Sequence, residues 1–206
     1  MTQSAGKKFK DHLAEEKPLK VVGAINAYCA MLAEHSGFKA VYLSGAGVAN
    51  ASFGLPDLGV TTLENVVEDA RRITAATDLP LLVDIDTGWD DVGETVRAME
   101  RAGVAAVHME DQVPQKRCGH RPNKELVSKE EMGARIQAAL DARTDPDFII
   151  MARCDALAPE GLDSAIERSA YYVECGADMI FAEAMTDINH YRRFKDAVKV
   201  PLLANI

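Results

Sequence analysis

Short apolar runs alternate with longer amphipathic segments along the whole chain. The apolar runs predict strands near residues 20–24, 40–44, 80–84, 105–110, 148–153, 179–183 and 201–205. The amphipathic segments predict helices near residues 6–16, 27–36, 62–77, 92–102, 128–142, 160–175 and 187–197. This alternation is typical of βα units arranged around a parallel sheet.

Polar side chains close most of the predicted strands. Three times, a glycine that follows a helix is followed seven residues later by a polar strand end: Gly37 by Ser44, Gly103 by Glu110, and Gly176 by Glu183. Other strands end at Asp84, Arg153 and Asn205. Strands buried on both faces should be apolar throughout. Polar residues at the carboxyl ends therefore mark the functional face of a barrel or an open α/β sheet.

The number of strands favours a TIM-like (β/α)8 barrel over a dinucleotide-binding sheet. The chain contains no GxGxxG fingerprint after a strand. A complete barrel has eight strands and typically about 250 residues, whereas this chain of 206 residues reaches only a seventh strand. We therefore expect residues 1–206 to form one incomplete barrel domain, truncated at its C-terminus.

Composition narrows the choice of partners. The net charge of -9 argues against a nucleic-acid or anionic-membrane partner. The N-terminus lacks the apolar core of a signal peptide, and the longest apolar runs are too short to span a bilayer. We expect a cytoplasmic protein whose four cysteines, which form no CxxC pair, are reduced thiols: Cys29, Cys118, Cys154 and Cys175.

A group of acidic residues lies where two predicted strands end. Asp84 and Asp86 would share one side of an extended segment, and Glu110 and Asp111 end the next strand. Taken alone, Asp84 and Asp86 suit an Asp-rich turn or a helix cap better than a metal site. Carboxylates from adjacent strands repel one another unless a cation or shared protons hold them. Mg²⁺ is usually bound by only a few carboxylates and keeps several of its waters, so we favour a metal site.

The segment 116–120 reads Lys-Arg-Cys-Gly-His. Nearby positive charge favours the thiolate form of a cysteine, so Cys118 is suited to nucleophilic or acid–base work. The flanking charges make a buried apolar cysteine a poor alternative. One alternative is that the segment is only a solvated surface loop. Zinc binding by Cys118, His120 and His108 is another, but the spacing of these residues matches no structural zinc pattern. The connection 111–127 is long for a βα loop, which favours a functional role.

Two further features suit an anionic ligand. Residues 44–47 offer backbone N–H groups and small side chains that could cradle a carboxylate, or form only a tight turn. Arg153 could bind a carboxylate bidentately, or form a salt bridge to Glu183 or Asp155. His108 suits a core or supporting position. Together these parts predict a small anionic substrate, a divalent metal and a thiol acid or base, as in carbon–carbon lyase or enolate chemistry.

Five blocks of sequence resemble the isocitrate lyase / phosphoenolpyruvate mutase superfamily. They cover residues 44–47, 84–88, 108–112, 116–122 and 204–206. The block around Cys118 is similar to that of the lyase branch, closest to lyases of 2-methylisocitrate. The resemblance implies Mg²⁺-dependent, retro-aldol (Claisen-type) cleavage of this tricarboxylate to pyruvate and succinate in propionate breakdown, by a homotetramer.

The resemblance also implies roles for individual residues. Asp84 and Asp86 would hold Mg²⁺, or Mn²⁺, with Glu110 in the water shell of the metal. The substrate site would be lined by Ser44, Gly45, Ala46, Cys118, Gly119, Arg153, Glu183 and Asn205. The catalytic residues would be Cys118 as the acid that protonates the succinate carbanion, His120 supporting the thiol, Lys116, and Asp57 near the metal and substrate.

Some positions depart from the family pattern, and two alternatives stay open. Ala46 replaces the middle of three glycines, and Asp90 and Asp91 follow Trp89 where the family usually has another glycine. Within the enzyme class the alternative is isocitrate lyase or a related enolate-forming enzyme. In another class, the chain would be an inactive remnant that binds a metal or a partner subunit.

Overall fold

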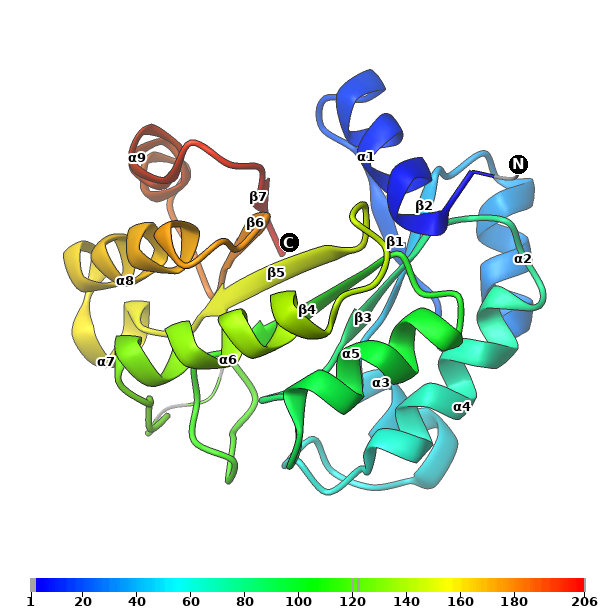
Figure 1. Cartoon of the computed structure of the whole chain (residues 1–206), viewed down its shortest axis with the longest axis horizontal. Coiled ribbons are helices and arrows are strands. Elements are labelled where there is room, and N and C mark those ends of the chain that lie inside the picture. Colours follow the sequence, from blue (N-terminus) through cyan, green and yellow to red (C-terminus); the bar gives the residue numbers. More distant parts are fainter. Residues whose placement is uncertain (1–2, 120, 122, 206) are drawn as a thin grey trace.

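Seven parallel strands form one sheet in which each strand pairs with its neighbour in the chain, in the order β1 to β7. The computed structural model describes residues 3–119, 121 and 123–205. The strands are β1 (Val21–Gly23), β2 (Ala40–Leu43), β3 (Leu81–Asp84), β4 (Ala106–Glu110), β5 (Ile149–Cys154), β6 (Met179–Ala182) and β7 (Leu202–Leu203). The sheet curls into a half-barrel (Figure 1), which confirms the predicted TIM-like architecture.

Helices connect the strands at every crossover. The long ones are α1 (Ala5–Glu15), α2 (Ala27–His35), α4 (Leu63–Thr74), α5 (Val92–Arg101), α6 (Lys129–Ala142), α8 (Leu162–Glu174) and α9 (Ile188–Val198). Each begins within two residues of its predicted start. Side-chain caps explain several of these starts: Thr62, Asp91 and Ser128 each accept a hydrogen bond from a backbone N–H in the first turn.

Three short helical segments were not predicted. The segment 44–47, expected to be a carboxylate cradle or a tight turn, begins a helix: α3 (Gly45–Gly47) continues into the π-helical η1 (Val48–Ser52). Whether it cradles a carboxylate stays a prediction. The side chains of Val48 and Ala49 are buried. Their burial anchors the segment, which explains why small residues here take a helical path. The third short segment is α7 (Leu157–Glu160), directly before α8.

Two apolar clusters hold the fold together. The larger one lies between the sheet and the helices that cover its outer side. The smaller one fills the concave side, where Phe9 of α1 packs with Leu82, Ile149 and Met151. In Figure 1, α1 lies at the opposite end of the strands from α3. The helix therefore covers one end of the half-barrel, and the strand carboxyl ends are left for the polar site.

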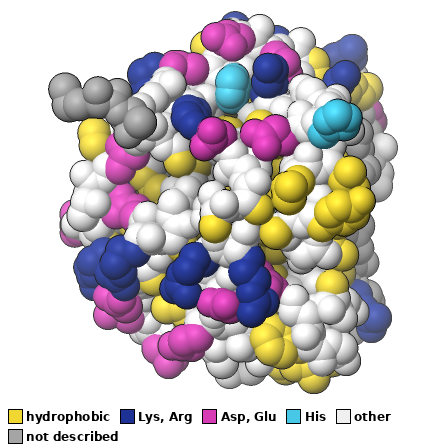
Figure 2. Space-filling view, turned by 90° about the vertical axis from the view of Figure 1, so that its right-hand side faces the viewer, with side chains coloured by type: hydrophobic (Ala, Val, Ile, Leu, Met, Phe, Trp, Pro, Cys, Tyr) yellow, Lys and Arg dark blue, Asp and Glu magenta, His cyan; other side chains and the backbone are white. Residues whose placement is uncertain are grey.

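The surface carries interspersed charges of both signs. Figure 2 shows this on one side of the molecule, with hydrophobic side chains gathered towards one edge. The large exposed apolar residues include Tyr28, Met31 and Leu32 of α2. Within the described residues, no helix is both long and apolar enough to cross a bilayer.

Candidate functional site

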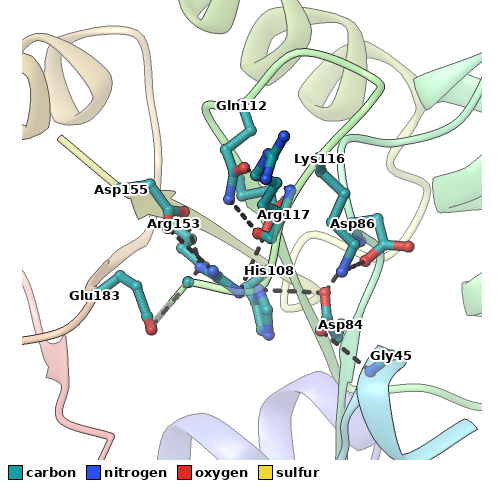
Figure 3. A network of polar contacts seen from close by, with 12 residues as sticks. Gly45, Asp84, Asp86, His108, Gln112, Lys116, Arg117, Arg153, Asp155 and Glu183 are labelled. Carbon is teal, nitrogen blue, oxygen red and sulfur yellow. Dashed lines mark hydrogen bonds and ion pairs between the residues drawn. The ribbon is translucent and has the colours of Figure 1, made fainter. Parts of the chain in front are cut away.

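The polar strand ends meet at one end of the half-barrel, as the sequence predicted (Figure 3). Asp84 pairs in register with His108, and Glu110 pairs in register with Arg153. Glu183 follows β6 directly. All five side chains are buried. Because the strands are parallel and in register, residues far apart in the sequence form one charged cluster.

Asp84 and Asp86 come together by a different route from the one predicted. The strand ends at Asp84, and Asp86 has a φ of 48°, which is the left-handed region. The segment is therefore a turn and not extended. Asp84 causes this turn, because its Oδ1 accepts a hydrogen bond from the Asp86 N–H at 3.0 Å. Its Oδ2 accepts one from the Gly45 N–H at 3.1 Å.

The ammonium group of Lys116 lies among these carboxylates. Its Nζ is 2.6 Å from Asp86 Oδ1 and 2.6 Å from Asp57 Oδ1. Burial, together with the charge of Asp84, raises the pKa of Asp86 to about 6. Burial would also raise the pKa of Asp84, but His108 and Lys116 hold it at about 2. One cation thus only partly offsets a concentration of buried negative charge.

His108 occupies a supporting position inside β4. Its Nε2 lies 2.9 Å from the Tyr42 hydroxyl, and its Nδ1 lies 3.8 Å from Asp84 Oδ1. Burial lowers the pKa of His108 to about 4, so the imidazole is neutral near pH 7. The prediction of a core or supporting histidine is confirmed. The zinc alternative includes His120, which lies outside the described residues.

Arg153 is surrounded by three carboxylates. Its guanidinium lies 3.0 Å from Glu110 Oε2, 2.9 Å from Asp155 Oδ2 and 3.8 Å from Glu183 Oε2. The salt bridges that were the alternative to anion binding are therefore present. Burial raises the pKa of Glu110 well above its usual value. Arg153 offsets part of the charge that the strand ends accumulate, and it faces the same space as the ammonium of Lys116 (Figure 3).

The described residues of the connection 111–127 fold back over this cluster. At its base, the Val113 N–H donates to the Glu125 carbonyl and the Val127 N–H donates to the Asp111 carbonyl, both at 3.0 Å. Near its tip, a Cβ atom added at Gly119 would overlap the side chains of Glu183 and Arg153. Only glycine permits this approach, which seats the backbone beside the half-buried Cys118 directly on the charged cluster.

The structure brings most of the predicted residues together, but some are less buried and one is not described. Asn205 follows β7 and is exposed, and Ser44 and Ala46 are half-buried beside Gly45. His120 lies outside the described residues. Two loop residues that hold the site were not predicted. The side-chain amide of Gln112 donates to the Arg117 carbonyl and accepts from the Arg117 N–H, both at 2.9 Å. Lys124 is buried and donates to Asp155, which directly follows β5. Neither has a spacing signal, because their partners are distant in sequence or are backbone atoms.

The acidic cluster fits a hard divalent cation. Glu110 Oε1 is buried and has no hydrogen-bond partner among the described residues, whereas Asp86 Oδ1 and Glu110 Oε2 are ion-paired with Lys116 and Arg153. No three His, Cys, Asp or Glu side chains of the described residues converge on one point as a complete ligand set. Mg²⁺ does not need such a set, because it commonly binds one or two carboxylates and keeps several waters. Asp84 and Asp86 therefore suit Mg²⁺.

A family model described as phosphoenolpyruvate phosphomutase matches residues 9–206. The chain belongs to this family. Among its relatives, 2-methylisocitrate lyase of Shewanella oneidensis is 64% identical over 209 residues, covering 100% of this chain and 72% of the relative. The 2-methylisocitrate lyase of Escherichia coli is 60% identical and covers 98% of this chain and 70% of the relative. The chain thus spans a little over two thirds of these relatives.

Solved structures of related enzymes share the fold. A crystal structure of 2,3-dimethylmalate lyase aligns with a TM-score of 0.92 at 33% identity, covering 100% of this chain and 71% of that one. A phosphonopyruvate hydrolase in complex with oxalate and Mg²⁺ aligns with a TM-score of 0.84 at 32% identity, covering 97% and 71%. The predicted superfamily and barrel architecture are confirmed.

Proposed function

We propose that this protein cleaves 2-methylisocitrate to pyruvate and succinate in a Mg²⁺-dependent reaction. The proposal is supported by relatives of that name at up to 64% identity along the whole chain. It is also supported by the chemistry of the site, which combines buried carboxylates, two cations and a thiol. Arg153 and Lys116 place two cations at this site, and both are groups that can contact a carboxylate of a tricarboxylate ligand.

The observation that carries the proposal is the seating of Gly119 on Arg153 and Glu183. This contact brings the loop with Cys118 onto the cluster that contains Asp84 and Asp86. A carbon–carbon lyase needs such an arrangement, because the acid must reach a carbanion from which water is excluded. An exposed thiol on a solvated loop could not provide this.

The reaction divides between two halves of the substrate. The hydroxyl carbon becomes the carbonyl carbon of pyruvate as its oxygen gives up a proton to a basic group of the site or to water. The adjacent carbon–carbon bond breaks, and its electron pair remains on the carbon that becomes part of succinate. Cys118 donates the thiol proton to that carbon. Arg153 binds a carboxylate of the substrate, and the loop excludes water from the carbanion.

Asp84 and Asp86 would hold Mg²⁺, with Glu110 bonded to its waters. When bound, the ion supplies positive charge that polarises the hydroxyl and carboxylate oxygens of the pyruvate half. The ammonium of Lys116 also supplies positive charge to this region, because it lies 2.6 Å from the Asp86 carboxylate. Assembly as a homotetramer and a cytoplasmic location stay predictions from the sequence.

The substrate is tested by supplying purified protein with Mg²⁺ and either 2-methylisocitrate or isocitrate. We expect pyruvate and succinate from the first substrate, little glyoxylate from the second, and no turnover in the presence of EDTA. A preference for isocitrate, with glyoxylate as the product, would contradict the proposed specificity. Binding of Mg²⁺ without turnover of either substrate would support the remnant alternative.

The role of Cys118 is tested by Cys118→Ser. A serine hydroxyl is a much weaker acid, so we expect turnover to fall by about 10²- to 10⁴-fold, the range for loss of general acid–base catalysis. Mg²⁺ binding measured by calorimetry should be unchanged. Cys29→Ser is the matched control, because Cys29 is another half-buried thiol and lies in α2. Unchanged kcat in Cys118→Ser would rule out the acid role.

A further inference from the structure

Lys124 is a buried lysine near the end of the loop 111–127. Its Nζ donates to the Gly119 carbonyl at 2.7 Å and to Asp155 Oδ1 at 2.9 Å. Both side chains of the ion pair are almost inaccessible to solvent, at 1% for Lys124 and 0% for Asp155. A buried ammonium is costly unless it is paired and hydrogen-bonded. The two partners therefore fix where this ammonium lies.

Asp155 is itself held in place from two sides. Its backbone N–H donates to Asp111 Oδ1 at 2.8 Å, and Asp111 Oδ2 accepts a hydrogen bond from the Tyr172 hydroxyl at 2.7 Å. Asp155 Oδ1 also accepts from Arg153 Nη2 at 3.1 Å. The carboxylate that binds Lys124 is thus a fixed part of the half-barrel, and it touches the arginine of the candidate site.

Lys124 holds the tip of the loop through its hydrogen bond to the Gly119 carbonyl oxygen. Gly119 directly follows Cys118 and is seated against Arg153 and Glu183. A charge-assisted hydrogen bond from a buried ammonium is among the stronger contacts that a carbonyl can accept. The bond fixes the carbonyl of the residue that follows Cys118, and so restricts where the thiol can lie.

We propose that Lys124 is a positioning residue that clamps the Cys118 loop closed over the site. It acts through the Gly119 carbonyl and uses Asp155 as its anchor. The expected effect on kcat rests on the proposed function of Cys118. The expected effect on the position of the loop does not, because the clamp is formed by contacts within this chain.

The clamp is tested with Lys124→Met, which keeps the length of the side chain and removes the ammonium. Alkylation of each cysteine by iodoacetamide is followed over time by peptide mass spectrometry. We expect the rate at Cys118 to rise by about tenfold or more, as expected for loss of one charge-assisted hydrogen bond. The rates at Cys29 and buried Cys154 should stay unchanged, which separates loop opening from general loss of folding.

Lys129→Met is the matched control. Lys129 also forms an ion pair, with Glu167, but lies on α6 and is partly exposed. This variant should leave the Cys118 alkylation rate and turnover unchanged. In Lys124→Met we expect kcat to fall by about tenfold to 100-fold, the scale for a misplaced reacting group, with KM changed far less than kcat.

The outcomes separate the two proposals. Faster alkylation of Cys118 in Lys124→Met, in a protein that does not cleave 2-methylisocitrate, would support the clamp and overturn the proposed function. An active wild-type protein with equal Cys118 alkylation and equal kcat in Lys124→Met would overturn the clamp. Equal increases at Cys118 and Cys154 would also overturn it, because they indicate a purely structural role.

Discussion

The Lys116 ammonium lies 2.6 Å from the Asp86 carboxylate, at the end of the strand that carries Asp84. Both side chains are buried, and Asp57 contacts the same ammonium. A cation from the loop therefore occupies the region where the acidic residues suit a metal ion. The contact between Lys116 and Asp86 therefore links the position of the connection 111–127 to the net charge of the acidic cluster.

Removing the ammonium should destabilise the protein and increase its response to Mg²⁺. Lys116→Met leaves Asp86 and Asp57 without their cation, so we expect the free energy of unfolding in EDTA to fall by about 3–5 kcal/mol. Added Mg²⁺ should raise the Tm more in this variant than in the wild type, because no ammonium competes for the carboxylates. Calorimetric melting in EDTA and in Mg²⁺ measures both effects.

Lys7→Met is the control for this prediction. Lys7 forms an ion pair with Asp11 on the exposed surface of α1, where solvent screens such pairs and they contribute little to stability. It should change neither the Tm nor the response to Mg²⁺ appreciably. An equal response to Mg²⁺ in Lys116→Met and the wild type would show that the lysine and the ion do not share the carboxylates.

A methyl group at Gly119 should prevent the loop from closing. The added Cβ would overlap Glu183 and Arg153, so Gly119→Ala should lower kcat by about 100-fold, as expected for misplaced reacting groups. The Tm should change little, because the core lies elsewhere. Gly23→Ala is the control, since nothing lies within 4 Å of a Cβ at that position. Normal kcat in Gly119→Ala would mean that the loop works from a different position.

Asp155 should make the protein sensitive to acid. Burial alone would raise the pKa of Asp155, but Arg153 and Lys124 hold it below its usual value. The folded state therefore favours the carboxylate. The stabilisation is present above the unfolded-state pKa of about 3.9, and it is lost as the pH falls further towards the folded-state pKa. Denaturant unfolding between about pH 5 and pH 2 measures this loss.

The matched variant for this pH dependence is Asp155→Asn. It keeps the size of the side chain and removes the charge, so stability should be lower at pH 7 and should vary less with pH below about pH 4. The same slope in both proteins would assign the acid sensitivity to other carboxyl groups.

Phe9 should be the main contributor of α1 to stability. Its side chain is 1% exposed and packs with Leu82, Ile149 and Met151 on the concave side of the sheet. Phe9→Ala should lower the free energy of unfolding by about 3–5 kcal/mol. Phe53→Ala is the control, because Phe53 is 46% exposed, and its loss should be much smaller. Urea unfolding of both variants tests whether α1 is part of the cooperative fold.

The sequence determined the order of strands and helices, because burial periodicity and cap residues act locally. It also predicted which strand ends carry polar groups, and that the long connection 111–127, which contains Cys118, has a functional role. Only the tertiary structure decided how the charges pair. Lys116 contacts Asp57 and Asp86, Arg153 contacts Glu110 and Asp155, and Lys124 reaches the Gly119 carbonyl. These partners have no common spacing along the chain. Strand register and loop path bring them together, and burial makes each pairing necessary because an unpaired charge there would be costly.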